Sequence, residues 1–215
     1  MKKIILALFI VGTAFTVNAQ TDAKAKAILA EVSKKYRTYD VIKTDFSYTL
    51  ENPQAKIKET QSGTIYVKSK ANKYKIILKG QELISDGKNQ WTYLKADKEV
   101  QLSEVDNNAE GINPAKIFNI YEKGFKSLYT NDTKVNGRLV HNIDLTPTDG
   151  KRTFFKVRLQ IDKLNKQITN AVIFDKNGNK YTYTIKTFTP NIKVPESTFA
   201  FDAKKYPGVE VVDLR

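Results

Sequence analysis

The sequence predicts a mainly β protein of the α+β class, in which one large curved antiparallel sheet carries helices on one face. Many short segments alternate between apolar and polar residues, which is the pattern of half-buried strands. Turn sequences such as Asp86–Asn89 and Lys176–Asn179 separate them at intervals of about 8 to 12 residues. The chain of 215 residues is short enough for a single domain.

The alternating segments predict about ten or eleven strands. Their apolar side is rich in tyrosine and phenylalanine, and their polar side is rich in lysine. A sheet of this size buries its apolar side, so the aromatic side chains are expected on the inner face and the lysines in water. The expected strands cover residues 42–50, 64–68, 73–79, 83–84, 91–93, 100–102, 139–145, 154–161, 168–174, 181–185 and 206–212.

Two segments have helical rather than alternating periodicity. From about Asp22 to Tyr39, apolar residues recur at steps of three and four. A second, shorter helix is expected after Asn113, with Pro114 in its first turn and Gly124 at its end. Both helices therefore have one apolar face to place against the sheet.

The first nineteen residues resemble a cleavable export signal. Lys2 and Lys3 precede an apolar run from Ile4 to Val11, and Val17-Asn18-Ala19 places small or compact residues at the expected cleavage site. We expect a signal peptide over residues 1–19, a cut after Ala19, and a mature domain over 20–215. The predicted location is the periplasm.

The charge and the absence of cysteine narrow the possible functions. The formal charge is +13, and removal of Lys2 and Lys3 leaves +11. The lysines are spread along every segment, so we expect a solvated basic surface that attracts anionic lipids or acidic proteins, and no nucleic acid. Without cysteine there are no disulfides or thiolate metal sites.

No recognisable set of catalytic residues is present. The single histidine, His141, alternates with apolar neighbours and is expected in the core. No Gly-x-Ser-x-Gly turn or glycine-rich phosphate loop occurs, so we expect no enzyme, no cofactor and no metal. A hydrolase with a carboxylate pair stays open as an alternative; the candidate carboxylates are Asp45, Glu51, Glu82 and Asp86.

Three sequence segments resemble the LolA family of periplasmic lipoprotein carriers. They are Gly63-Thr-Ile-Tyr-Val-Lys68, Asn72-Lys-Tyr-Lys-Ile76 and Ser85-Asp-Gly-Lys-Asn-Gln-Trp-Thr-Tyr93. The strands at Leu145 and Phe155–Ile161 and the ending from Phe199 to Val209 are also similar, in the same order.

This resemblance implies an incomplete antiparallel β-barrel of about eleven strands with an α-helical lid on its concave side. It also implies a monomeric chaperone that receives acylated lipoproteins from an inner-membrane ABC transporter and passes them to an outer-membrane acceptor. An arginine that closes the lid in the family is replaced here by Lys70 or, without an inserted residue, by Ser69. We expect Lys70 to be the latch.

The expected lipid-binding cavity combines the apolar side of the early strands with the underside of the second helix. Aromatic side chains offer a large contact area without a tight fit. A filled core remains possible, as do a carrier of another lipid or glycolipid and a sensor with the same fold. The proposed lining is Phe46, Tyr48, Ile65, Val67, Tyr74, Ile76, Trp91, Tyr93, Ile117, Phe118 and Tyr121.

Overall fold

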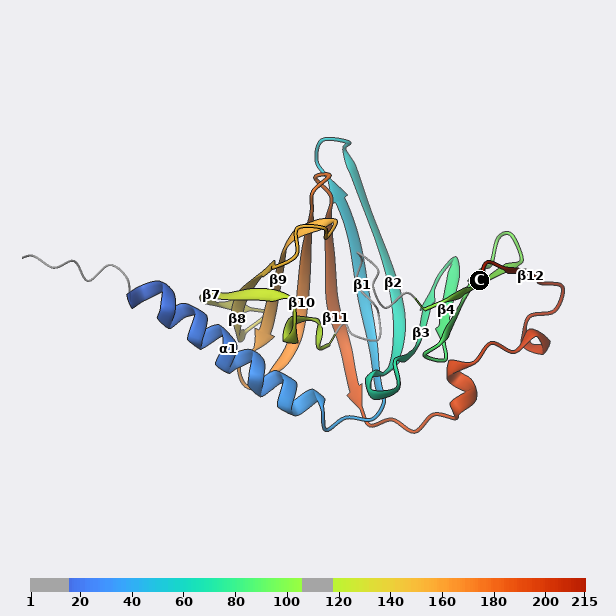
Figure 1. Ribbon diagram of the computed structural model, residues 1–215, viewed down its shortest axis with the longest axis horizontal. Helices are drawn as coiled ribbons and strands as arrows, with labels where there is room; N and C mark the ends of the chain where they lie inside the picture. Colours follow the sequence, from blue (N-terminus) through green and yellow to red (C-terminus); the bar gives the residue numbers. More distant parts are fainter. Residues whose placement is uncertain (1–15, 106–117) are drawn as a thin grey trace, which may run out of the picture.

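The computed structural model describes residues 16–105 and 118–215, and its centre is one open sheet of twelve strands (Figure 1). The neighbouring strands follow the order β12-β6-β5-β4-β3-β2-β1-β11-β10-β9-β8-β7. Every neighbouring pair is antiparallel except β12 and β6, which run parallel. Because β7 and β12 do not pair with each other, the barrel is incomplete, as the sequence predicts.

The strands agree closely with the alternating segments of the sequence. The first six are β1 (Ile42–Asn52), β2 (Ile57–Lys68), β3 (Lys73–Leu78), β4 (Gln81–Ser85), β5 (Asn89–Leu94) and β6 (Glu99–Glu104). The others are β7 (Phe125–Val135), β8 (Arg138–Pro147), β9 (Phe154–Asp162), β10 (Gln167–Asp175), β11 (Lys180–Pro190) and β12 (Glu210–Asp213). Strand β7, over residues 125–135, has no counterpart in the sequence-based prediction.

Register shifts bend one half of the sheet. They interrupt the pairing of β1 with β11 at Asp45/Phe46, of β7 with β8 at Tyr129/Asn131, and of β9 with β10 at two places. A bulge adds a residue to one strand and increases the local twist. Strict alternation along β9 would place Phe155 on the same face as Val157 and Leu159, but the shift at Phe174/Asp175 changes this: Phe154 is buried, whereas Phe155 is 50% exposed.

Helix α1 (Thr16–Tyr36) packs its apolar stripe against the inner face, beside β7 (Figure 1). Five of its residues are almost completely buried, at the three- and four-residue spacing that predicts an amphipathic helix: Ala25, Ile28, Leu29, Val32 and Tyr36. The helix begins six residues before the predicted start and ends three residues before Tyr39. No helix among residues 16–105 and 118–215 is both long and apolar enough to cross a bilayer.

Two predicted features fall partly or wholly outside the described residues. The expected signal peptide lies mostly in residues 1–15, and the predicted cut after Ala19 falls near the start of α1. The second expected helix begins outside the described residues, and over residues 118–124 the structure has no α-helix. Its described end contains a single 3-10 turn, η3 (Ile120–Glu122), which is followed by Gly124 with a positive φ of 78°.

A C-terminal segment covers the outer face of β3 to β6. This strap, defined as residues 193–215, contains the 3-10 turns η4 (Glu196–Phe199) and η5 (Ala203–Lys205) and ends in β12. Figure 1 shows it passing β3 and β4 at the end of the sheet opposite α1. Phe199 is 1% exposed, so the strap forms a second apolar layer on this side.

Candidate functional site: an apolar cavity under a helical cover

The inner face of the sheet encloses a cavity of about 130 Å³. Its walls come from both halves of the sheet, and residues just before β7 lie over it. Eleven of the twelve lining side chains carry no polar group, and the twelfth belongs to Tyr183. The lining residues are Phe46, Ile65, Ile76, Phe118, Ile120, Val157, Leu159, Ile168, Ala171, Ile173, Tyr183 and Ile185.

Strand register explains why these residues meet on one face. Phe46 pairs with Ile185 across β1 and β11, and Ile65 pairs with Ile76 across β2 and β3. Residues directly opposite each other in neighbouring strands point to the same side of the sheet. On the far side of the cavity, Ala171 pairs with Tyr183 and with Leu159 in the same way.

The cover over the cavity consists of residues 118–122 and the C-terminal half of α1. The Phe118 ring lies 5.4 Å from the Tyr36 ring and 5.9 Å from the Phe188 ring. The Ser33 hydroxyl donates a hydrogen bond to the Tyr121 hydroxyl at 3.4 Å, and Glu122 pairs with Arg37 at 3.2 Å. Among the described residues, these two polar contacts and the ring packing join residues 118–122 to α1 and to Arg37, the residue that follows it.

The electrostatics of the cavity favour an uncharged ligand. Burial raises the pKa of the Tyr183 hydroxyl, and burial likewise raises the pKa of Tyr121, so both stay neutral near physiological pH. No charged side chain of the described residues lines the cavity. Among residues 16–105 and 118–215, no group of three His, Asp or Glu residues could hold a metal ion.

Four of the predicted cavity residues line it: Phe46, Ile65, Ile76 and Phe118. Three others lie near it within the inner-face core. Val67 and Tyr74 are fully buried, and the Tyr74 hydroxyl donates to Gln90. Tyr121 forms part of the cover.

The remaining predicted residues lie farther from the cavity or outside the described chain. Tyr48 stacks on Tyr181 and lies 5.1 Å from the Tyr183 ring, next to a lining residue. Ile117 lies outside the described residues.

Trp91 and Tyr93 do not line the cavity, and this corrects the prediction. Trp91 pairs with Ile84, and Ile84 pairs with Lys75, so these three side chains lie on the same face of the sheet. Tyr74 and Ile76, the neighbours of Lys75 in β3, point to the inner face, so Lys75 points to the outer face. Both aromatics therefore point to the outer face. There the Trp91 ring stacks on Phe201 at 6.3 Å, and the Tyr93 ring meets Tyr206 at 4.8 Å.

Sequence reasoning also missed the wall formed by β9, β10 and β11. Val157, Leu159 and Ile173 belong to strands whose alternation was recognised, but no residue of the second half was assigned to the cavity. The available signal was that alternation, which is regular in β9 at Val157, Leu159 and Ile161 and interrupted in β10 at Asn170. The missing information was the pairing of β1 with β11, which brings the two halves together.

Lys70 lies on the surface, in the short 3-10 turn η1 (Ser69–Ala71). No hydrogen bond or ion pair links its side chain to another residue in the described part of the chain. Its neighbours have a different role: Lys68 and Lys73 both bind the Glu196 carboxylate of the strap, the latter at 2.9 Å. In this structure the basic residues around η1 therefore hold the strap.

An open, strongly curved sheet with an apolar cavity beneath a helical cover defines a protein that can enclose an apolar ligand. The sequence model of the family described as outer membrane lipoprotein carrier protein LolA matches residues 37–202. Because the match spans most of the chain and includes eleven of the twelve strands, all but β12, the chain belongs to the LolA family.

Solved structures share this architecture at low sequence identity. An uncharacterised conserved protein from Thermus thermophilus superposes with a TM-score of 0.55 at 15% identity, over 88% of this chain and 99% of that one. An outer membrane lipoprotein-sorting protein domain from Vibrio parahaemolyticus has a TM-score of 0.50 at 16% identity, over 83% of this chain and 97% of that one. MucB has a TM-score of 0.50 at 14% identity, over 84% of this chain and 64% of that one. These similarities show the fold. No curated protein matches the sequence.

Proposed function

We propose that the chain is a periplasmic carrier that encloses the acyl chains of lipoproteins and moves them from the inner to the outer membrane. The observation that carries this proposal is the apolar cavity under a cover held by few polar contacts. Exposure of an acyl chain to water costs about 0.8 kcal/mol per methylene. A lipoprotein can therefore cross an aqueous compartment only with its acyl chains shielded.

The size of the cavity indicates how loading occurs. Its 130 Å³ is smaller than the roughly 300–1,000 Å³ of typical small-molecule pockets, so it is too small for several acyl chains. Phe118 and Ile120 close it from the side of the cover, and neither belongs to a strand. Loading then consists of the outward movement of these side chains, while the sheet keeps its shape.

Release of the cargo requires that the bound state is not too stable. Apolar contacts to Phe46, Ile65 and Ile173 are non-directional, so acyl chains of different length fit without specific hydrogen bonds. The chain itself supplies no energy for transfer in this scheme. An inner-membrane ABC transporter loads it, and an outer-membrane acceptor unloads it. The basic surface then steers docking to acidic faces of these partners.

The decisive experiment compares two phenylalanine variants for lipoprotein loading in the periplasm of a Gram-negative host. Phe46 lines the cavity, whereas Phe155 lies half exposed on the outer face, where its ring packs 6.2 Å from Phe174. Phe46→Glu places a charged carboxylate among apolar side chains and should abolish the soluble lipoprotein complex, because the charge is costly to desolvate. Phe155→Glu should load like the unmodified chain.

Native mass spectrometry of the purified periplasmic protein reads out the complex and identifies its ligand. Ile120→Glu, in the cover, serves as a second cavity variant, and circular dichroism verifies the sheet in each. Equal loading of Phe46→Glu, Ile120→Glu and the unmodified chain would contradict the proposal. If a lipid or glycolipid co-purifies in place of a lipoprotein, the fold carries a different cargo.

A further inference from the structure

Two neighbouring hairpins at one end of the sheet expose aliphatic side chains to solvent. Leu164, in the turn between β9 and β10, is 87% exposed, and Leu139, at the start of β8, is 53% exposed. The backbone N–H of Lys163 donates to the Leu139 carbonyl at 3.0 Å, so the two leucines lie on adjoining segments. We call this region the hairpin edge: Lys134, Val135, Arg138, Leu139, Lys163, Leu164 and Lys166.

The turn that carries Leu164 is held rigidly. The Asp162 carboxylate is 2% exposed and accepts hydrogen bonds from the backbone N–H groups of Leu164 at 3.0 Å and Asn165 at 2.7 Å. The Lys166 N–H closes the turn on the Asp162 carbonyl at 2.9 Å. A buried carboxylate is therefore used to present a leucine that makes little contact within the described chain.

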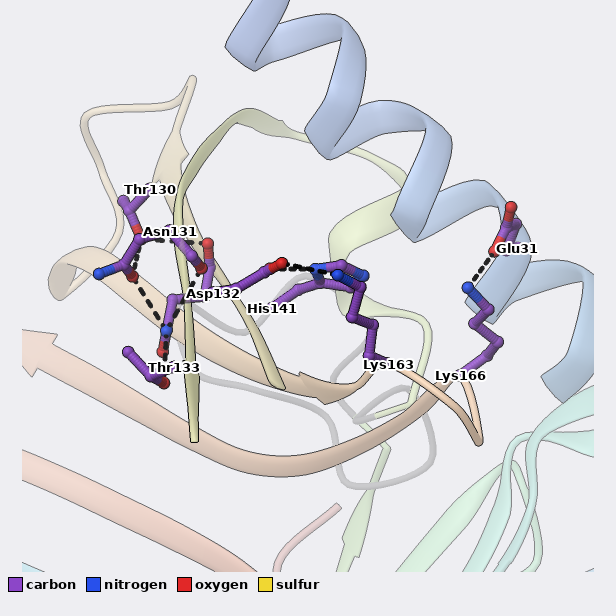
Figure 2. Close-up of polar contacts among 9 residues, drawn as sticks. Glu31, Thr130, Asn131, Asp132, Thr133, His141, Lys163 and Lys166 are labelled. Atoms are coloured by element: carbon purple, nitrogen blue, oxygen red, sulfur yellow. Dashed lines mark hydrogen bonds and ion pairs between the residues drawn. The ribbon is translucent and has the colours of Figure 1, made fainter. Parts of the chain in front are cut away.

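Basic residues flank the exposed leucines in the chain, and Figure 2 shows two of them, Lys163 and Lys166, with their carboxylate partners. Lys163 reaches the Asp132 carboxylate at 2.8 Å, Lys166 reaches Glu31 of α1 at 2.9 Å, and Arg138 lies 3.6 Å from Asp162. Lys134 pairs with Leu139 across β7 and β8, and Lys35 of α1 donates to the Asn165 carbonyl. Asp132 and Asp162 lie mostly inside the fold, whereas Lys163, Lys166, Arg138 and the single acidic side chain Glu31 keep much of their surface in water, so the exposed charge of these groups is mainly basic.

From this combination we infer that the hairpin edge docks on the surface of an anionic lipid bilayer. In such docking, the aliphatic tip inserts among the acyl chains and the flanking lysines bind the lipid phosphates above them. Surface-binding elements commonly combine hydrophobic insertion with electrostatic attraction in this way. The inference deepens the proposed function and rests on it. Ile168 lines the cavity and follows the docking turn directly in β10, so docking brings a cavity wall to the bilayer.

Co-sedimentation of the mature chain with vesicles tests the inference. Vesicles containing phosphatidylglycerol should bind the chain, vesicles of phosphatidylcholine alone should bind it much less, and added salt should weaken the binding. Leu164→Asp should weaken binding about tenfold or more, because a buried leucine side chain contributes strongly to transfer. Leu214→Asp is the matched control: Leu214 is 59% exposed near the C-terminus and should be neutral.

A labelling experiment locates the contact directly. Because the chain has no cysteine, Leu164→Cys carries a single polarity-sensitive fluorophore, and Leu214→Cys carries the same label as its control. The emission should shift to the blue on phosphatidylglycerol vesicles only at position 164. A shift at neither position, or an equal shift at both, would overturn the inference, as would a Leu164→Asp effect on oligomeric state without an effect on vesicle binding.

The two proposals fail separately. Leu164→Asp leaves the cavity intact, so it should still bind a soluble acylated peptide in the absence of vesicles. Loss of acyl binding by the unmodified chain, with vesicle binding retained, counts against the carrier function alone. Retained acyl binding without vesicle binding counts against the docking edge alone.

Discussion

Gly63 shows how a single residue controls the distance between strands at the cavity. A methyl group at this position would lie 2.8 Å from the Ile77 carbonyl oxygen, 2.6 Å from a Leu78 methyl and 3.0 Å from the Phe46 ring. Its φ angle requires no glycine, so the constraint is space. The close approach of β2 and β3 beside a lining residue explains why glycine stands there.

Gly63→Ala should therefore destabilise the protein by about 1–3 kcal/mol, the usual cost of overpacking, because a backbone carbonyl cannot move aside as a side chain can. Urea denaturation measures this cost. Gly80→Ala is the matched control, since no atom lies within 4 Å of the added methyl group. An equal effect of both substitutions would show that backbone flexibility, and not the close contact, decides the result.

Asp132 is the second residue with a clear energetic role. Burial raises the pKa of its carboxyl group, but hydrogen bonds from Lys163 and His141 oppose this and hold the pKa below its ordinary value. His141 Nδ1 lies 2.5 Å from the Asp132 carboxylate (Figure 2). A carboxyl whose folded-state pKa is depressed stabilises the fold above its unfolded pKa of about 3.9, and this contribution is lost as the pH falls below that value.

Asp132→Asn should thus cost about 1–2 kcal/mol of unfolding free energy near neutral pH. The difference from the unmodified chain should shrink when unfolding is measured at about pH 3, below the unfolded-state pKa. Chemical denaturation at the two pH values provides both numbers. A difference that stays constant would mean that Asp132 acts through packing or neutral hydrogen bonds alone.

At the scale of elements, the strap stabilises the end of the sheet that α1 does not cover. The Phe201 ring stacks on Trp91, the Tyr206 ring meets Tyr93 edge to face, and the Tyr206 hydroxyl donates to Glu82 at 3.0 Å. Strand β12 also pairs with β6, which would otherwise be an exposed edge. The strap therefore packs against the outer face of the short strands β3 to β6.

Trp91 is the single tryptophan of the chain, so its fluorescence reports on the strap. Phe201→Ala should shift Trp91 emission to the red, because loss of the stacked ring admits water to the indole. Cleavage of residues 193–215 by protease should become faster in the same variant. Phe155→Ala is the control, because Phe155 lies on the outer face of β9, several strands away from Trp91, and should change neither the emission nor the cleavage rate. An unchanged Phe201→Ala spectrum would show that the strap does not shield Trp91.

The strap also depends on the Glu196 carboxylate. Hydrogen bonds from Lys68 and Lys73 lower the pKa of Glu196 to about 2, so the carboxylate stays charged and bound to both lysines at neutral pH. These lysines flank the turn in which the family resemblance placed a lid latch. The contact explains why this turn is basic even though Lys70 has no partner in the described chain.

At the scale of the whole molecule, the open sheet has a cavity on its inner face beside a well-packed hydrophobic core. Bulges curve the half from β7 to β1, and α1 fills only the part beside β7. Phe118 and Ile120 line the cavity from the side of the cover. Among the described residues, α1 and residues 118–122 cover the curved inner face, and the cavity lies between this cover and the sheet.

Loading should stabilise the molecule as a whole. A ligand that binds only the folded state adds about 2.7 kcal/mol at a free concentration of about 100 times its Kd, so the melting temperature should rise with the concentration of a soluble diacylated peptide. Differential scanning calorimetry follows this shift. Phe46→Glu should abolish the shift and Phe155→Glu should retain it; an equal rise in both would place the ligand outside the cavity.

The sequence by itself determined the class of fold, most of the strands, the amphipathic stripe of α1 and the family. These features are local: alternation, turn residues and helical spacing are properties of neighbouring residues. Four cavity residues, Phe46, Ile65, Ile76 and Phe118, could also be identified from aromatic and aliphatic alternation together with the family resemblance.

Only the tertiary structure decided which face each strand turns inward and which distant strands share the cavity. A shift of one residue moves a whole strand's side chains to the opposite face, so the alternation in β5 could not tell whether Trp91 pointed inward or outward. The pairing of β1 with β11 joins segments more than 100 residues apart and adds Ile173 and Tyr183 to the wall. Register and long-range pairing arise from the packed sheet, and no local pattern contains them.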